Sequence, residues 1–126
     1  MSESGSGRWY TRAVWGVGDI ERSAAFYIGK LGFTENWRYA EEGKPLIVQV
    51  ARGEFEVILS TQWPERVGHG VGYVEMQSDA LDALRVEFEG RGVAVEDGWW
   101  GNRLMVIKDP DGNQLWFPYP DEGGAK

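Results

Sequence analysis

Apolar and polar residues alternate along several short segments of the chain, which is the pattern of half-buried β-strands. The expected strands are residues 13–17, 34–40, 46–51, 54–61, 71–77, 94–97, 103–108 and 114–118. Turn residues separate them, including Gly43-Lys44, Arg52-Gly53 and Pro110-Asp111-Gly112-Asn113, where glycine or asparagine can take a positive φ. The pattern predicts a chain built mainly from short strands.

Two helices are expected, one after the first strand and one after the fifth. The first starts at Asp19 and ends near Gly32-Phe33, and the second starts at Asp79 and ends near Gly92-Val93. A carboxylate at a helix start accepts hydrogen bonds from free N–H groups, and a glycine after the last turn adopts the left-handed conformation. The starts (79 − 19) and the ends (92 − 32) both lie 60 residues apart. This spacing indicates a duplication in which each half is a strand, a helix and three strands.

The duplication predicts an α+β fold in which two βαβββ modules form one domain. We expect the first module at residues 8–64, the second at 65–119, and disordered tails at 1–7 and 120–126. Strand alternation turns Phe55, Val57 and Leu59 toward a helix and leaves Glu54, Glu56, Ile58 and Ser60 on the opposite face. Val74 and Met76 likewise share one face. Two such sheets would curl their second, aromatic-rich faces into a cleft.

Composition narrows the range of partners. The formal charge of −7 disfavours nucleic acid and mildly favours a cationic ligand, although such a charge also serves solubility alone. The absence of cysteine excludes disulfides and thiolate chemistry. The chain contains no apolar run long enough for a membrane span and no signal-peptide pattern near residue 1, so we expect a cytoplasmic protein that does not bind membranes. Seven tryptophans in 126 residues indicate that some line a pocket or an interface.

Three motifs resemble the vicinal-oxygen-chelate superfamily of glyoxalases, bleomycin-resistance proteins and dioxygenases. Residues 17–23 (VGDIERS), followed by Phe26-Tyr27 and Leu31-Gly32-Phe33, resemble its opening, and residues 109–113 (DPDGN) resemble its closing turn. Trp100-Gly101 resembles the bleomycin-resistance branch. The resemblance spans residues 12–118. It implies a curled mixed sheet and a homodimer in which the partner subunit completes each cleft, but this fold hosts many chemistries.

The same resemblance places the metal ligands of the metal-dependent members at positions that cannot bind a metal here. These positions are occupied by Arg12, Ile58, Tyr73 (or Gly72 if the register slips by one) and Trp116. A catalytic divalent metal needs about three nitrogen or oxygen donors. The chain has one histidine, His69, between glycines. We therefore expect neither a metal nor a cofactor, and we expect Arg12 to pair with a cleft carboxylate or with an acidic group of the ligand.

Aromatic residues occupy the expected cleft instead. Trp37 and Trp100 match aromatic positions of the bleomycin-resistance proteins, and Trp116 replaces the ligand glutamate. The predicted ligand-binding residues are Arg12, Trp37, Glu56, Ile58, Tyr73, Glu75, Trp100, Arg103 and Trp116. The alternative is that each tryptophan packs in the core or at a dimer interface, which is the favoured reading for Trp15. The roles of Trp63 and Trp99 stay open.

These observations favour a metal-independent homodimer that sequesters an aromatic or glycopeptide-type antibiotic or another toxic natural product. The leading alternative is an enzyme: a cofactor-independent lyase, isomerase or hydrolase with Glu56 or Glu75 as base and Arg12 as electrophile. A glyoxalase or dioxygenase with an unusual metal site is the third reading. The sequence fixes neither the ligand nor whether the protein also transforms it.

Overall fold

The computed structural model describes residue 7 and residues 9–120, and these form two mixed four-stranded sheets. The first sheet contains β1 (Ala13–Gly16), β2 (Thr34–Glu41), β3 (Lys44–Arg52) and β4 (Phe55–Ser60), in the order β1-β4-β3-β2. The second contains β5 (Val71–Tyr73), β6 (Glu96–Trp99), β7 (Arg103–Lys108) and β8 (Gln114–Pro118), in the order β5-β8-β7-β6. In both, the first strand runs parallel to the last and the other pairs are antiparallel. The predicted α+β fold of two βαβββ modules is confirmed.

Helices follow the first strand of each module. Helix α1 (Ile20–Ala24) continues as a π-helix, η2 (Ala25–Lys30), and α2 covers Ser78–Gly90. Asp19 caps α1 as predicted, because its Oδ1 accepts a hydrogen bond from the Arg22 amide at 2.9 Å. The expected start of the second helix at Asp79 was displaced: α2 begins at Ser78, and Asp79 lies inside its first turn. Gly32 and Gly92 end the helical segments at φ +78° and +79°.

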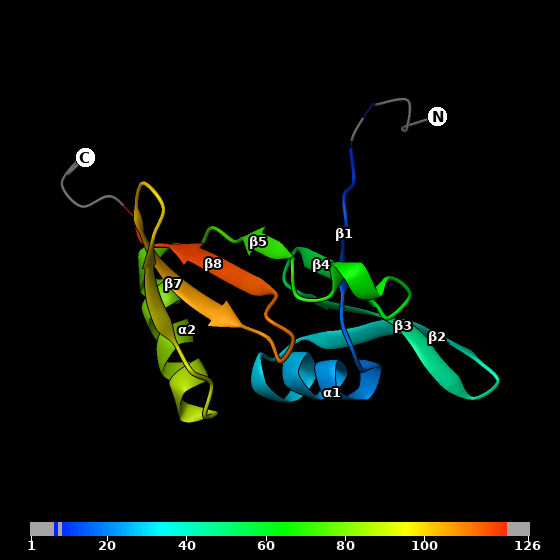
Figure 1. Cartoon of the computed structure of the whole chain (residues 1–126). Helices are drawn as coiled ribbons and strands as arrows, with labels where there is room; N and C mark the ends of the chain where they lie inside the picture. The colour runs from blue at the N-terminus through cyan, green and yellow to red at the C-terminus, as the bar shows by residue number, and fades with distance from the viewer. Residues whose placement is uncertain (1–6, 8, 121–126) are drawn as a thin grey trace.

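Both helices lie against the same side of the sheets, with the long β2–β3 hairpin extending away from them (Figure 1). The core fills the layer between sheets and helices. Its fully buried members include Tyr27, Leu31, Val48, Val57, Leu59, Leu81, Phe88, Met105, Ile107 and Leu115. The predicted alternation of β4 holds, since Val57 and Leu59 are buried and Phe55 packs partly buried against the core. The opposite face of each sheet has no helix over it, and we call it the open face.

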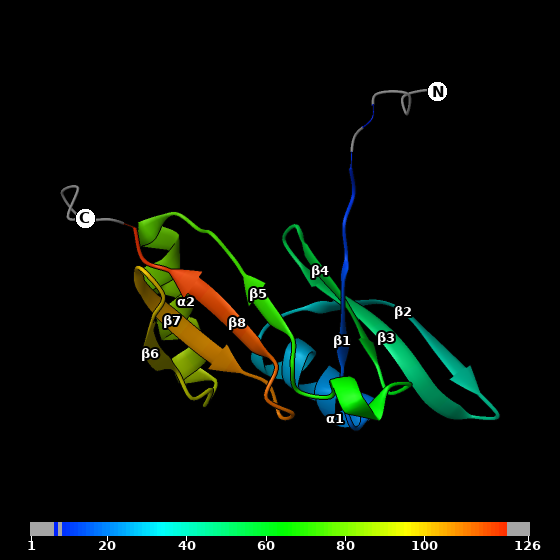
Figure 2. The same ribbon diagram turned by 45° about the horizontal axis from the view of Figure 1, so that its top comes forward.

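The two modules meet where β5, the edge strand of the second sheet, lies next to β1, the edge strand of the first (Figure 2). Trp15 of β1 is 5% exposed and packs edge-on against Phe55, with ring centroids 5.8 Å apart. A Cβ on Gly70 would lie 2.5 Å from Cδ2 of Trp15, and a Cβ on Gly72 would lie 3.1 Å from Cζ of Phe55. The junction therefore requires glycine at positions 70 and 72, because a side chain at either would clash with Trp15 or Phe55.

A set of buried hydrogen bonds ties the closing turn of the second module to the first module. The Tyr27 hydroxyl donates to Oδ2 of Asp109 at 3.0 Å, and Asn113 Nδ2 donates to the Gly16 carbonyl at 3.0 Å. Asp109 also accepts from the backbone amides of Asp111 and Asn113, both at 2.9 Å. These contacts give the DPDGN segment a structural role, and we call them the closing-turn clamp.

Other boundaries differ from expectation. The strand expected at 71–77 pairs only over Val71–Tyr73, because the following residues turn away from β8 toward α2. The strand expected at 94–97 lies at Glu96–Trp99, and a short 3-10 helix, η3 (Pro64–Arg66), was not anticipated. The expected disorder at 1–7 and 120–126 falls, apart from Gly7 and Pro120, outside the described residues. Within them, no helix is long and apolar enough to cross a membrane.

Candidate functional site

Three of the predicted aromatic residues gather on the open face of the second sheet. Tyr73 and Trp116 are neighbours on the parallel strands β5 and β8. Trp100 contacts both, with ring centroids 5.7 Å from Tyr73 and 5.5 Å from Trp116. We call these residues the tryptophan cluster. Val106 pairs with Trp116 and is only 7% exposed although no helix covers it, which indicates that the large side chains around it exclude water.

The cluster is held in place yet presents ring surface to solvent. Trp116 Nε1 donates to Oε1 of Gln114 at 2.8 Å, which fixes the orientation of the indole. Trp100 lies in the β6–β7 turn, where its amide donates to the Asn102 carbonyl at 2.9 Å. Asn102 Nδ2 in turn donates to the Tyr119 carbonyl at 2.6 Å. Tyr73 and Trp100 are nevertheless 48% and 62% exposed. Preorganised, accessible rings of this kind suit the binding of a flat ligand.

The open face of the first sheet carries a second group of predicted residues. Strand pairing aligns Val14, Ile58, Gln49 and Trp37 in one row across β1, β4, β3 and β2. Trp37 Nε1 donates to Oε1 of Gln49 at 3.0 Å, and Trp37 is 44% exposed. This row therefore exposes an indole whose polar atom is already satisfied, leaving its ring for apolar contact.

Arg12 and Glu56 form an ion pair beside that row. Arg12 Nε lies 3.1 Å from Oε1 of Glu56, and the Tyr10 hydroxyl donates to the same oxygen. This hydrogen bond raises the pKa of the Tyr10 hydroxyl. The guanidinium of Arg12 also lies 4.6 Å from the centre of the Tyr10 ring. The expected pairing of Arg12 with a cleft carboxylate is thus present in the structure.

Arg103 does not border the tryptophan cluster. Leu104 and Val106 pair with Pro118 and Trp116 on the open face, so alternation turns Arg103 to the side that carries α2. There its guanidinium lies 4.1 Å from the centre of the Tyr119 ring. The structure therefore does not bring Arg103 to the tryptophan cluster, because a one-residue step along a strand reverses the face. Its role in ligand binding stays a prediction.

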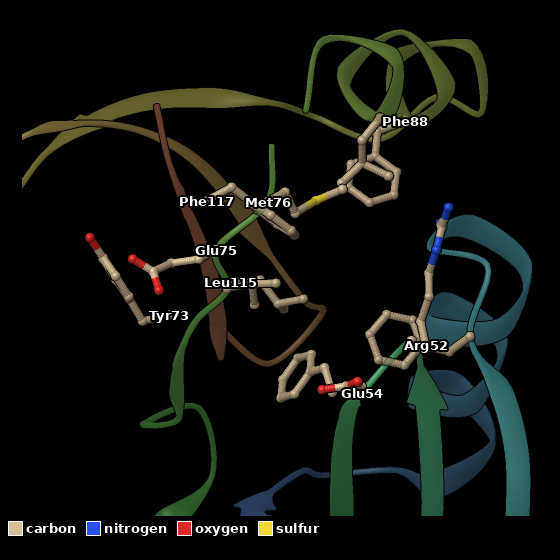
Figure 3. A pocket seen from close by; sticks show the side chains of 13 residues that line it. Arg52, Glu54, Tyr73, Glu75, Met76, Phe88, Leu115 and Phe117 are labelled. Atoms are coloured by element: carbon tan, nitrogen blue, oxygen red, sulfur yellow. The ribbon is translucent and has the colours of Figure 1, made fainter. Parts of the chain in front are cut away.

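The structure brings the remaining predicted residues into separate groups rather than into one groove. Tyr73 and Glu75 line a cavity of about 600 Å³ between the two modules, together with apolar residues of the helix side such as Leu115 and Phe117 (Figure 3). Within the described chain, no hydrogen bond or ring contact joins the tryptophan cluster to Trp37 or to the Arg12–Glu56 pair.

The positions that carry metal ligands in metal-dependent relatives offer no such site in this geometry. Arg12 is paired with Glu56, and Trp116 points its ring nitrogen at Gln114. Among residue 7 and residues 9–120, no three histidine, aspartate or glutamate side chains converge on a common point. The chemistry that these residues provide is therefore stacking on aromatic rings, hydrogen bonding and charge pairing.

Two residues that contact the predicted site residues were not predicted from the sequence. Gln49 is 4% exposed and links Trp37 to Asn36, to whose Oδ1 it donates at 2.9 Å. A polar residue inside the apolar run 46–51 was the available signal, since buried polar groups are nearly always hydrogen-bonded. Tyr10 gave no comparable signal, because its partner Glu56 is 46 residues away in the sequence.

Solved structures of other proteins share this fold. The chain resembles TnmS3, an antibiotic binding protein from Streptomyces sp. CB03234 (24% identity, TM-score 0.70, covering 90% of this chain and 97% of that one). It also resembles the bleomycin-binding protein of Streptomyces verticillus, solved with copper(II)-bleomycin (20% identity, TM-score 0.69, 90% and 98% covered). Lactoylglutathione lyase from Agrobacterium tumefaciens is similar too (18% identity, TM-score 0.64, 90% and 96% covered).

No curated protein sequence matches the chain at a significant level. A family does match: residues 10–117, which include both sheets except for the last residue of β8, fit the description Glyoxalase/Bleomycin resistance protein/Dioxygenase superfamily. The match agrees with the two βαβββ modules seen in the structure. The chain therefore belongs to the glyoxalase/bleomycin resistance protein/dioxygenase superfamily.

Proposed function

We propose that this protein binds and sequesters an aromatic natural product, such as an antibiotic, on the open faces of its sheets. The observation that carries the proposal is the tryptophan cluster, in which Tyr73 and Trp100 are about half exposed and Trp100 packs against Trp116, whose indole is oriented by a hydrogen bond to Gln114. Large exposed aromatic surfaces on a folded domain mark interaction sites more often than isolated apolar residues do. The antibiotic-binding proteins among the structural neighbours support the same function.

The binding free energy available from such an aromatic surface is sufficient to sequester a ligand. An offset or edge-on contact between aromatic rings contributes about 0.5–1.5 kcal/mol beyond the burial of area, and a cation over a ring adds about 0.5–2 kcal/mol. Three rings and the apolar burial around them support micromolar to nanomolar binding, which corresponds to roughly −8 to −12 kcal/mol. The charge of −7 favours neutral or cationic aromatic compounds over small acids.

A homodimer is part of the proposal. The tryptophan cluster and the group around Trp37 and Arg12 lie on different sheets, so a second copy is a means of placing one group opposite the other. The exposed ring of Trp37 supports this arrangement, because a large apolar side chain gains most when a partner covers it. Sedimentation equilibrium tests it: a dimer is expected, and a monomer at micromolar concentration contradicts it.

Fluorescence titration with bleomycin, an intercalating antibiotic and an enediyne-type aromatic compound tests the function. Trp100→Ala and Trp116→Ala are each expected to weaken binding by about 1–3 kcal/mol. Trp99→Ala is the matched control, because Trp99 is 76% exposed and pairs with Arg103, which places it on the side away from the cluster. If the control weakens binding as much as the other two, the cluster is not the site.

The fate of the ligand separates binding from catalysis. The ligand is incubated with excess protein, the protein is then denatured, and the released compound is analysed by mass spectrometry. We expect the mass of the compound to be unchanged. A changed mass that is lost in Glu56→Gln or Glu75→Gln would replace the binding proposal with the enzyme alternative, since loss of a general base costs about 10²–10⁴ in rate.

A further inference from the structure

The cavity between the modules lies mainly on the helix side of the sheets and meets the open face of the second sheet at Tyr73. Its walls come from both halves of the chain: Phe33 and Phe55 belong to the first module, and Leu84, Phe88, Leu115 and Phe117 to the second. Figure 3 shows Met76, Leu115 and Phe117 projecting into it from one side and Arg52 and Glu54 bordering it from the other. At about 600 Å³ it falls within the size range of small-molecule pockets, and its lining is mainly aromatic and aliphatic.

The charged groups that border the cavity are not equivalent. Arg52 is fully engaged: Nη1 donates to the Leu31 carbonyl at 2.7 Å and to Glu87 at 2.9 Å, and Nη2 donates to Glu87 at 3.0 Å. Within the described chain, neither Glu54 nor Glu75 takes part in an ion pair or a side-chain hydrogen bond. Glu54 lies in the β3–β4 turn and Glu75 between β5 and α2, so the two carboxylates border the cavity at separate places on its rim. In Figure 3 the Glu75 carboxylate points toward Tyr73, away from Leu115 and Phe117.

We propose that this cavity is a second ligand site that takes an organic amine, with an aromatic or aliphatic body in the apolar interior and a protonated nitrogen at the rim, paired with Glu54 or with Glu75. The apolar walls supply burial for the body. The two carboxylates complement a positive charge, while the Arg52 charge is already balanced by Glu87. An anion of the same shape meets two carboxylates and no available cation in the described lining, so the site selects for charge as well as for shape.

The site does not depend on the tryptophan cluster. Tyr73 borders both, but Trp100 and Trp116 do not line the cavity, and its apolar walls lie on the helix side of the sheets. A ligand of the open faces and an amine in the cavity thus share only Tyr73 among these residues, so substitution of Trp100 or of Glu54 affects one site and not the other.

The test uses three compounds that share a naphthalene ring and differ in charge. They are the cation 1-naphthylmethylamine, the neutral alcohol 1-naphthalenemethanol and the anion 1-naphthaleneacetate. Binding is followed by NMR of the full chain, labelled at the methyl carbons of its three methionines. Met76 lines the cavity and reports on it. Met105 is fully buried in β7 and does not line it, so it serves as the internal reference. The amine is expected to shift the Met76 methyl resonance with saturation, the alcohol to bind more weakly, and the acetate to bind least.

Glutamine variants test whether the carboxylates cause the preference for the amine over the alcohol. In Glu54→Gln/Glu75→Gln the affinity for the amine is expected to fall about five- to tenfold and to become equal to that of the alcohol. Glu42→Gln, at the other end of β3 in the β2–β3 turn, removes the same kind of charge and is expected to leave the preference intact. Trp100→Ala is expected to leave the Met76 response unchanged, which keeps this proposal distinct from the function proposed above.

Three outcomes would overturn the proposal. They are no saturable shift of Met76 with any probe, equal binding of amine and acetate, and a preference for the amine that survives in the double glutamine variant. A Met76 resonance that changes with protein concentration and not with probe would instead assign the cavity to contact with a second copy of the chain.

Discussion

Substituting Gly70 by alanine should destabilise the protein through a clash at the junction of the modules. The added Cβ would lie 2.5 and 2.6 Å from Cδ2 and Cδ1 of Trp15, about 1 Å inside normal contact distance. Neither side can retreat easily. The Gly70 amide donates to Asn113 Oδ1 at 2.7 Å, its carbonyl accepts from the Gln114 amide at 2.8 Å, and Trp15 is buried.

The expected loss follows from that confinement. Inserting a methyl group into a well-packed core typically costs about 1–3 kcal/mol. Because the backbone is held on both sides, we expect Gly70→Ala to lower the free energy of unfolding by about 3 kcal/mol, a large share of the roughly 5–15 kcal/mol of a typical domain. Gly90→Ala is the control, since nothing lies within 4 Å of its added Cβ at the end of α2. It should be neutral or stabilising by up to about 1 kcal/mol.

Urea unfolding, followed by circular dichroism and by tryptophan fluorescence, measures both variants. A double-mutant cycle identifies the cause: in a Trp15→Leu background the penalty of Gly70→Ala should fall below about 1 kcal/mol, because the ring that it clashes with is absent. A Gly70→Ala protein within 0.5 kcal/mol of wild type would refute the reasoning, and so would a penalty unchanged by Trp15→Leu.

Two further predictions concern hydrogen-bonded pairs that join the modules. Tyr27→Phe should cost about 1–2 kcal/mol, because it removes a buried donor to Asp109. Burial and the Asp109 charge raise the Tyr27 pKa well above its usual value, so above about pH 10 the unfolded chain loses this proton before the folded one does, and wild-type stability falls with rising pH. Urea unfolding at pH 8 and pH 11 should show a smaller fall in the variant. Arg52 lowers the Glu87 pKa mainly through its hydrogen bonds, which stabilises the fold above the usual carboxyl pKa and less as the pH falls below it. The stability gap between wild type and Arg52→Gln should thus be larger at pH 7 than at pH 3, and an equal gap would contradict this account.

Local patterns allowed most of the fold to be predicted. The helix start at Asp19 and the helix ends at Gly32 and Gly92 were correct, because capping depends on a few neighbouring residues. The start at Asp79 was off by one residue, since Ser78 could already enter the helix. The extent of β5 was overestimated because alternation continues to residue 77, whereas pairing ends at Tyr73, where the chain turns toward α2 although β8 itself continues to Pro118.

The candidate site was harder to predict, because its geometry depends on distant parts of the chain. Grouping Tyr73 with Trp116 required only the right face of two paired strands. Placing Arg103 in the same group failed, because its strand turns it toward Tyr119. The cavity between the modules had no sequence signal of its own, since it exists only where Phe55 of one half faces Leu115 of the other.

The closing-turn clamp has a consequence for the order in which the protein can fold. Its hydrogen bonds join residues that are far apart along the chain: Tyr27 and Asp109 are separated by 82 positions, and Gly16 and Asn113 by 97. A ribosome releases the first half of the chain well before it has made the turn, so the Tyr27 hydroxyl and the Gly16 carbonyl remain without these partners during synthesis. Contacts of such long range slow folding, because the entropy of closing the loop is lost before the contact forms. The first module therefore lacks these buried contacts and is held by its own strand pairing until the closing turn has been synthesised.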